Sequence, residues 1–187
     1  VSGSGLQNRD EELFGHKPFA VIADYLARNG IASLRYDDRG FAESTGDPAT
    51  ATTYDNASDA AAAISHARSG KRFSKVGILG HSEGGMIAFI LGARKNAPDF
   101  IVTMGAPAVR ADSILLYQNR RVMEKSGMPQ DMTDEYIEAL GKLLQYKIDN
   151  PGKKITSDEM EIFCPGWGAK PVYKELSEAL MKNFSEP

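Results

Sequence analysis

The chain has 187 residues, of which 42% are hydrophobic and 25% charged, and its formal net charge is −3. This composition is typical of one globular domain, with or without a lid. The small negative charge argues against nucleic acid as a partner, and no apolar run approaches the roughly 20 residues that span a membrane. The one cysteine, Cys164, excludes an internal disulfide and any multi-cysteine metal site, and we expect a buried or incidental thiol.

Short apolar strands alternate with helices in the first part of the chain. Pro18 occupies the position of a first helical residue, and Gly30 ends the helix that follows it. Ile31–Tyr36 is expected to form a strand. After a polar loop, Thr52 and Asp55 predict a capping box at the start of an alanine-rich helix. The narrow stripe of small residues on this helix predicts close packing on a sheet.

The alternation continues through a serine-containing motif. The run Val76–Phe89 reads VGILGHSEGGMIAF, which places a GxSxG motif between an apolar strand and an apolar helix. Phe100–Met104 is predicted to add one more strand. Alternation of this kind indicates a parallel sheet with helices on both faces.

Beyond residue 108 the pattern changes to helices alone. The Leu, Met and Tyr residues of this region could line a substrate site, although ordinary helix packing is the simpler interpretation. The helices are expected over Ile114–Lys125, Thr133–Ile148, Thr156–Phe163 and Pro171–Phe184.

The GxSxG motif centred on Ser82 is the strongest sign of chemistry. A sharp turn from strand to helix lifts the serine hydroxyl above the sheet edge and strains its backbone, which defines a nucleophile elbow. Such a turn needs positions almost free of side chain on both sides, and Gly80 and Gly84 provide them. The amide of Glu83 is then expected to face a developing oxyanion at the start of a helix. The alternative is a glycine-rich turn whose serine only caps the helix.

Three stretches of the chain together resemble the bacterial carboxylesterase branch of the α/β hydrolase superfamily, and more distantly serine aminopeptidases and prolyl-oligopeptidase-type enzymes. They are SGSGLQNRDEE, GHKPFAVIADYLARNGIASLRYDDRGFAEST and KVGILGHSEGG. The resemblance implies an α/β fold. Residues 1–108 would form an incomplete parallel sheet with flanking helices, and residues 109–187 a helical cap.

The resemblance also implies further site residues. It places the second oxyanion amide in the turn just after the strand beside the elbow, where Ser4 is the expected donor and Gly5 the next choice. A flexible glycine-serine end is the structural alternative. Asp38 and Arg39 are expected to brace loops around the site, in a cluster with Asp37 whose charges satisfy one another and nearby backbone.

The histidines of the chain depart from the family pattern. The triad runs in the order serine, acid, histidine, but no histidine follows Ser82. His81 lies inside the elbow with its side chain directed away from the serine, and His66 is a surface or packing residue on a helix. His16 could approach the site edge, but it would serve as a base only in an altered constellation. The acidic residues of the helical region are not assigned as the triad acid: Asp112, Asp131 and Asp134.

The sheet implied by these elements is incomplete, because it lacks the strands that carry the acid and the histidine. Such a sheet would expose unpaired edges and apolar helix faces. We therefore expect the chain to be part of a longer polypeptide. It opens on Val1-Ser2-Gly3, in the manner of the middle of a protein, so its start does not indicate a localisation.

The function expected from these features is that of a serine hydrolase. Ser82 would attack a small-molecule acyl ester, and water would release the acid from an acyl-enzyme. No metal or organic cofactor is implied. A serine peptidase or an acyl thioesterase would use the same turn, and a non-catalytic binding module that kept the turn is the alternative of another class. Without the base, the isolated segment is expected to be nearly inactive.

Overall fold

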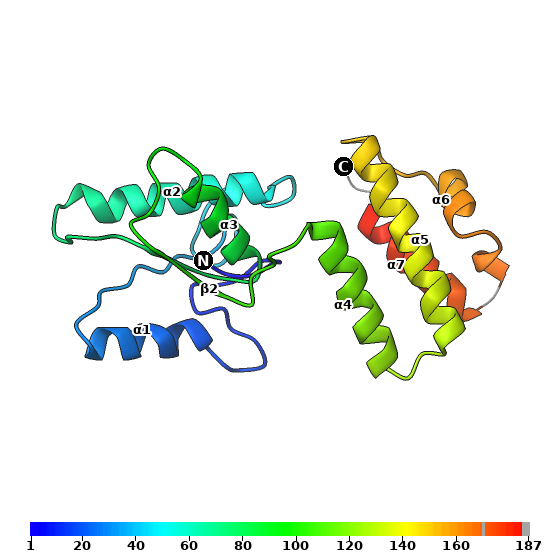
Figure 1. Cartoon of the computed structure of the whole chain (residues 1–187), viewed down its shortest axis with the longest axis horizontal. Coiled ribbons are helices and arrows are strands. Elements are labelled where there is room, and N and C mark those ends of the chain that lie inside the picture. Colours follow the sequence, from blue (N-terminus) through cyan, green and yellow to red (C-terminus); the bar gives the residue numbers. More distant parts are fainter. Residues whose placement is uncertain (170, 185–187) are drawn as a thin grey trace. The chain divides into compact units, whose positions relative to one another are not determined.

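The computed structural model describes residues 1–169 and 171–184, which belong to two compact units. The first unit comprises Val1–Ala108 and the second begins at Val109. Each is described by itself (Figure 1). The elements of the first unit are α1 (Pro18–Arg28), α2 (Thr53–Ser69), β1 (Ile78–His81), α3 (Glu83–Gly92) and β2 (Ile101–Met104).

The first two helices begin and end where local sequence signals place them. Pro18 is the first residue of α1, and Gly30 follows the helix with a φ of +74°, a conformation that glycine adopts without steric cost. At α2 the Thr52 side chain accepts the Asp55 N–H, and the Asp55 side chain accepts the Thr52 N–H. The predicted capping box is therefore confirmed.

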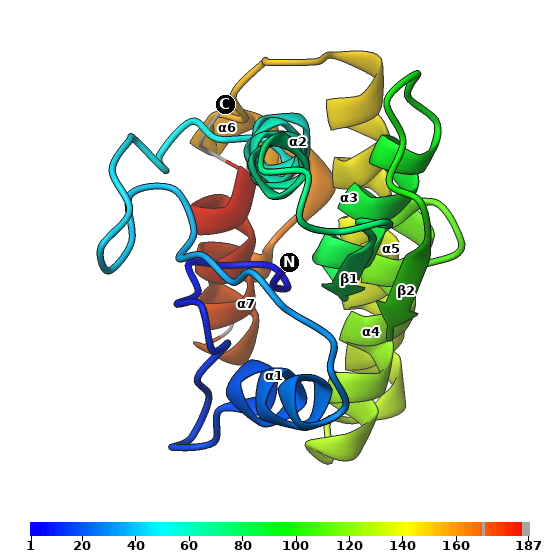
Figure 2. The same ribbon diagram turned by 90° about the vertical axis from the view of Figure 1, so that its left-hand side faces the viewer.

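The sheet contains two parallel strands, with Ile78 of β1 opposite Ile101 of β2. Helix α3 packs on both strands and α2 packs on α3, whereas α1 lies on the opposite side of the strands (Figures 1 and 2). Val1 lies along the other edge of β1, because its amino group donates to the Leu79 carbonyl and its carbonyl accepts the His81 N–H.

The strand predicted over Ile31–Tyr36 is not formed, and this prediction was wrong. Among the described residues, the backbone N–H groups of 32–36 make no ladder bonds, and the Ile31 N–H donates back to Leu26 of α1. Ile31 and Leu34 are about half exposed. The apolar pattern of a segment indicates its tendency to be buried, but a strand also needs a neighbour that completes its hydrogen bonds.

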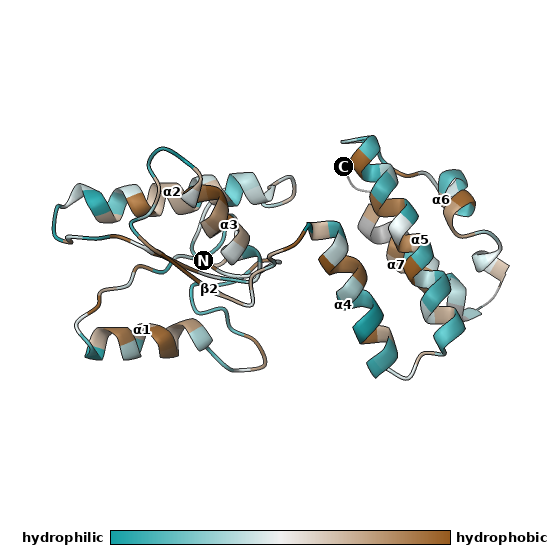
Figure 3. Cartoon of the chain, in the orientation of Figure 1, coloured by the Kyte–Doolittle hydropathy of each residue, from teal (hydrophilic) through white to brown (hydrophobic). Residues whose placement is uncertain are grey.

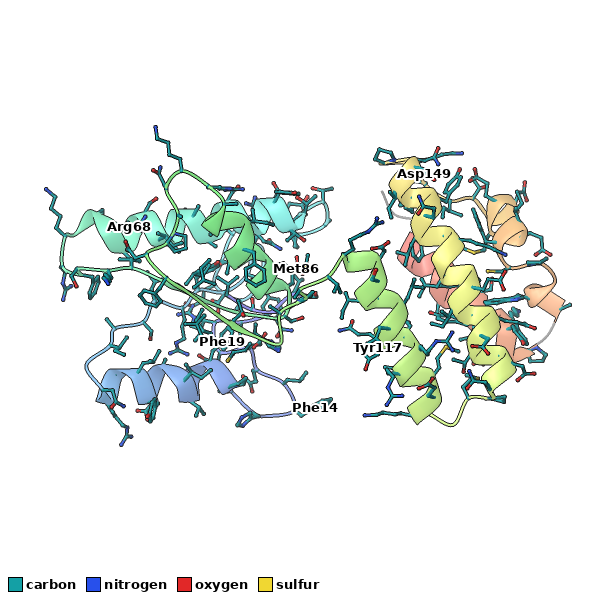
Figure 4. All side chains as sticks on the ribbon, viewed as in Figure 1. Phe14, Phe19, Arg68, Met86, Tyr117 and Asp149 are labelled. Atoms are coloured by element: carbon teal, nitrogen blue, oxygen red, sulfur yellow. The ribbon has the colours of Figure 1, made fainter. Side chains whose placement is uncertain are left out.

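The core of the first unit is small. The buried face of α2 consists largely of alanine, including Ala57 and Ala60, and it meets Ile87 and Ala88 of α3. Small side chains let the two helices approach closely. Helix α3 is apolar along nearly its whole length (Figure 3). In the loop that precedes α1, the Phe14 side chain projects into solvent, whereas Phe19 within α1 is buried (Figure 4).

The second unit consists of helices. The four helices predicted from the sequence are present, and Thr156 and Glu159 form a second capping box. A single core cluster joins the helices, with Leu143 and Leu180 fully buried and Trp167 between Tyr136 and Tyr173. The elements are α4 (Ala111–Lys125), α5 (Gln130–Asp149), α6 (Ser157–Phe163), the 3-10 turn η1 (Trp167–Ala169) and α7 (Pro171–Phe184).

Within the described part of the chain, no helix combines the length and the apolar character needed to cross a lipid bilayer.

Candidate functional site

Ser82 lies in a strained turn between a strand and a helix. Its φ is +50° and its ψ −116°, with β1 ending at His81 and α3 beginning at Glu83. The Ser82 N–H donates to the Met104 carbonyl of β2 at 2.9 Å. A non-glycine residue in such a conformation costs on the order of 1–3 kcal/mol and persists only where its surroundings fix it. The predicted turn between strand and helix is confirmed.

The two glycines of the motif are required by crowding around this turn. A Cβ atom on Gly80 would lie 2.1 Å from the Gly84 carbonyl oxygen, and a Cβ atom on Gly84 would lie 2.2 Å from the Val1 carbonyl oxygen. Both distances are far below van der Waals contact. The serine can therefore hold its position only because the backbone on each side has no side chain.

The Ser82 side chain does not cap α3. It makes no capping hydrogen bond, so the interpretation of the motif as a plain helix cap is wrong. Among the described residues, the backbone amides of Glu83 and Ser4 donate no hydrogen bond. The Glu83 carboxylate is turned toward α2, where it accepts the Thr53 hydroxyl at 2.7 Å. The first turn of α3 thus presents an open N–H beside Ser82.

The loop that carries Ser4 lies directly against the serine. A Cβ atom on Gly3 would lie 3.2 Å from the Ser82 Cβ, and Ser4 itself is exposed. Gly3, Asp38 and Glu83 line one pocket beside the turn. The convergence of the Ser4 and Glu83 amides on one point stays a prediction.

Asp38 holds this loop at two points. Its carboxylate accepts the Ser2 hydroxyl at 2.7 Å and the Gln7 N–H at 2.8 Å. Burial raises the pKa of Asp38, and these hydrogen bonds partly offset that effect. The carboxylate therefore contacts the residues on both sides of Ser4.

The neighbouring charges pair with other segments rather than with one another. Asp37 accepts two guanidinium bonds from Arg9, at 3.0 and 2.6 Å, as well as the Arg9 N–H, and these bonds hold the Asp37 pKa far below its usual range. The Arg39 guanidinium donates two hydrogen bonds to the Asp59 carboxylate of α2, in a bidentate pair. The expectation that these charges satisfy one another is wrong, because each of them pairs with a different stretch of chain. The expected bonds to backbone are present, since Asp37 accepts the Glu43 N–H as well as that of Arg9.

Glu11 is a site residue that the sequence analysis missed. It is 8% exposed and has a φ of +50°. Its Oε1 accepts the Gly3 N–H at 2.7 Å and lies 2.7 Å from the His81 Nδ1. A carboxylate can only accept, so the His81 Nδ1–H donates to it. The one signal in the sequence was the position of Glu11 inside the stretch SGSGLQNRDEE.

The structure brings no histidine to the serine within the described residues. His81 donates to Glu11, and His66 is exposed on α2. His16 is also exposed and exchanges backbone hydrogen bonds with Leu13. No hydrogen bond joins any of these rings to the Ser82 hydroxyl in the described part of the chain.

Other reactive groups in the described part of the chain are paired or buried. Asp112 and Asp134 pair with Arg110 and Arg120 in the second unit. Cys164 is buried, as predicted, and burial raises the pKa of its thiol to about 11, so it stays protonated at neutral pH. Residues 1–169 and 171–184 contain no group of three or more His, Cys, Asp or Glu side chains placed to hold a metal ion.

Comparison with known proteins identifies the family. The model of the family described as serine aminopeptidase, S33 (Hydrolase_4), matches residues 17–132, which is more than half of the chain and includes the Ser82 turn. The chain therefore belongs to this family, within the α/β hydrolase superfamily. It is also 31% identical over 166 residues to Esterase EstD of Thermotoga maritima. That alignment covers 88% of this chain and 38% of EstD, so the chain spans about two fifths of the relative's length.

Proposed function

We propose that the protein is a serine hydrolase that cleaves carboxylic esters through an acyl-enzyme on Ser82. The observation that carries this proposal is the strained backbone of Ser82, together with a Ser82 hydroxyl that makes no capping hydrogen bond to α3. Strain of this kind is retained where function requires it. The match to a hydrolase family and the similarity to a protein named an esterase support the same conclusion.

In the proposed reaction the Ser82 Oγ attacks the acyl carbonyl carbon, and the carbonyl electrons move to oxygen. The open N–H groups of Glu83 and Ser4 stabilise this oxyanion, aided by the positive end of α3. Collapse of the intermediate expels the alcohol, which takes up a proton, and water then hydrolyses the acyl-enzyme. The histidine that moves these protons and its acidic partner are expected outside this chain.

Two substrate classes fit the comparisons. Esters are favoured by the similarity to Esterase EstD, while the family description favours the aminoacyl amide bond cleaved by a serine aminopeptidase. The turn supports either reaction, because both pass through a tetrahedral oxyanion. Acyl thioesters would react in the same way.

The helical unit that begins at Val109 is proposed to form a cap. It follows β2 directly, and the family match continues into it as far as residue 132. A helical segment at this point of the chain would cover the site and select substrates by size.

The test uses the protein produced from its complete gene. A fluorophosphonate probe is expected to label Ser82, and Ser82→Ala is expected to lower ester hydrolysis by at least about 10⁴-fold, since triad members act as a unit. Ser58→Ala is the matched control, because Ser58 is exposed on α2 and its hydroxyl, among the described residues, bonds only to the Tyr54 carbonyl. Matched ester, thioester and aminoacyl amide substrates then separate the classes. An unlabelled protein with no activity on any of the three would contradict the proposal.

A further inference from the structure

We propose that Glu11 is a positioning residue that fixes the loop carrying Ser4 against the Ser82 turn. This inference rests on the proposed function and deepens it. It begins from the two hydrogen bonds that meet at one oxygen: the Glu11 Oε1 accepts the Gly3 N–H and the His81 Nδ1–H, each at 2.7 Å. Gly3 immediately precedes the proposed donor Ser4, and His81 immediately precedes the proposed nucleophile. A single carboxylate oxygen therefore links the two segments that supply the oxyanion donors.

Glu11 occupies this position in spite of two free-energy costs. The carboxylate is buried, with its side chain 10% exposed, and burying a charge is costly unless donors surround it. Its backbone is also in the left-handed region, which costs on the order of 1–2 kcal/mol for a residue with a Cβ. A glutamate that served only packing would be better replaced by an apolar residue with ordinary backbone angles.

Local hydrogen bonds fix the turn that presents Glu11. Asn8 organises it: the Asn8 side-chain oxygen accepts the N–H groups of Asp10 and Glu12, and the Asn8 carbonyl accepts the Glu11 N–H at 2.9 Å. These bonds hold Glu11 with its side chain directed inward while Glu12 stays exposed. The carboxylate is thus placed before any substrate arrives, as a preorganised site requires.

The loop around Ser4 is held on both sides and free in the middle. Ser2 and Gln7 bond to Asp38, Gly3 bonds to Glu11, and Ser4 and Gly5 between them are exposed. Of these contacts, the one from Glu11 is nearest in sequence to Ser4, and through His81 it joins the loop to the end of β1. At the start of the loop the Val1 carbonyl also accepts the His81 N–H. Loss of Glu11 should therefore move the Ser4 amide relative to Ser82 while Asp38 still holds the loop.

The activity test compares Glu11→Ala and Glu11→Gln with Glu12→Ala in the protein produced from its complete gene. Glu11→Ala is expected to lower kcat for ester hydrolysis by about 10²-fold, the order of one lost oxyanion donor, with KM changed by less than about threefold. Glu11→Gln keeps an acceptor for the Gly3 N–H and is expected to lose only about tenfold, the difference between a charged and a neutral acceptor. Glu12→Ala should match the parent.

A second readout does not depend on activity. Hydrogen exchange of the Gly3 amide is expected to be at least about tenfold faster in Glu11→Ala than in the parent, and close to the parent in Glu11→Gln. If Glu11→Ala fails to fold, Glu11→Gln still decides the question through the kcat to KM split. The inference would be overturned by an unchanged kcat in a folded Glu11 variant. It would also be overturned if the Gly3 amide exchanged at the same rate in Glu11→Ala as in the parent.

These outcomes separate this inference from the proposed function. Full activity in Ser82→Ala would refute the nucleophile but leave the exchange result to decide the role of Glu11. Loss of activity in Ser82→Ala together with full activity in Glu11→Ala would refute the positioning role alone.

Discussion

The two units of the chain are stabilised by different kinds of residue. In the first unit alanines form much of the buried face of α2, and the buried polar residues Glu11 and Asp37 tie loops together. The second unit buries large apolar and aromatic side chains, among them Leu143 and Trp167, in a single cluster. Buried charges add little net stability, because the cost of desolvation offsets much of the attraction between paired groups. The first unit thus relies more on polar contacts between loops, whereas the second relies on the packing of large apolar side chains.

The largest stability effect is expected in the core of the second unit. Leu143→Ala removes a side chain with 0% exposure, so the free energy of unfolding should fall by about 3 kcal/mol from lost transfer energy and the cavity left behind. Trp167 is the only tryptophan of the chain and belongs to the same cluster, so its fluorescence during urea unfolding reports on this unit. Leu115→Ala, at a side chain 41% exposed, should shift the midpoint little. Equal effects of the two variants would mean that this core is not packed as described.

The first unit should respond to added rather than removed volume. Ala57 is fully buried on the face of α2 that packs on α3, and Ala57→Leu should destabilise this unit by about 1–3 kcal/mol through overpacking. The measurement is urea unfolding followed by circular dichroism, with the Trp167 transition recorded in parallel. Ala62→Leu on the exposed face of α2 is the control. If Ala57→Leu unfolded at the same urea concentration as the parent, the proposed difference between the two cores would be wrong.

Most of the fold could be predicted from the sequence because its helices carry local signals. The capping boxes at Thr52 and Thr156, the proline at the start of α1 and the glycine after it all act within a few residues. The strand expected over Ile31–Tyr36 depends instead on a distant partner, and local pattern carries no information about that partner. The apolar pattern of this segment suggested a strand, but the pattern could not show whether a neighbouring strand was there to pair with it.

The site divides in the same way. Ser82 and its glycines could be predicted because the strained turn and the crowding around it are imposed within a pentapeptide. Glu11 could not, because its role depends on contacts with Gly3 and His81, the second of which lies 70 residues away. Arg39 was expected to pair with neighbouring carboxylates, yet its partner Asp59 lies on α2. Charge in a sequence shows that partners are needed but does not show which ones.

The smallest predicted effect concerns pH and the second unit. Glu159 bonds to Lys153 at 2.7 Å and caps α6 through Thr156, and these contacts lower the pKa of Glu159 to about 2. Because the folded pKa lies below the unfolded one, the stabilisation is fully present above about pH 4.5 and is lost as the pH falls toward 2. In Glu159→Gln this part of the acid sensitivity should disappear, so the Trp167 unfolding midpoints of parent and variant should differ near neutral pH and converge in acid. Glu138→Gln, at an exposed pair with Lys142 on α5, should run parallel to the parent. Parallel curves for Glu159→Gln as well would show that the polar contacts of α6 add nothing to a unit that packing alone maintains.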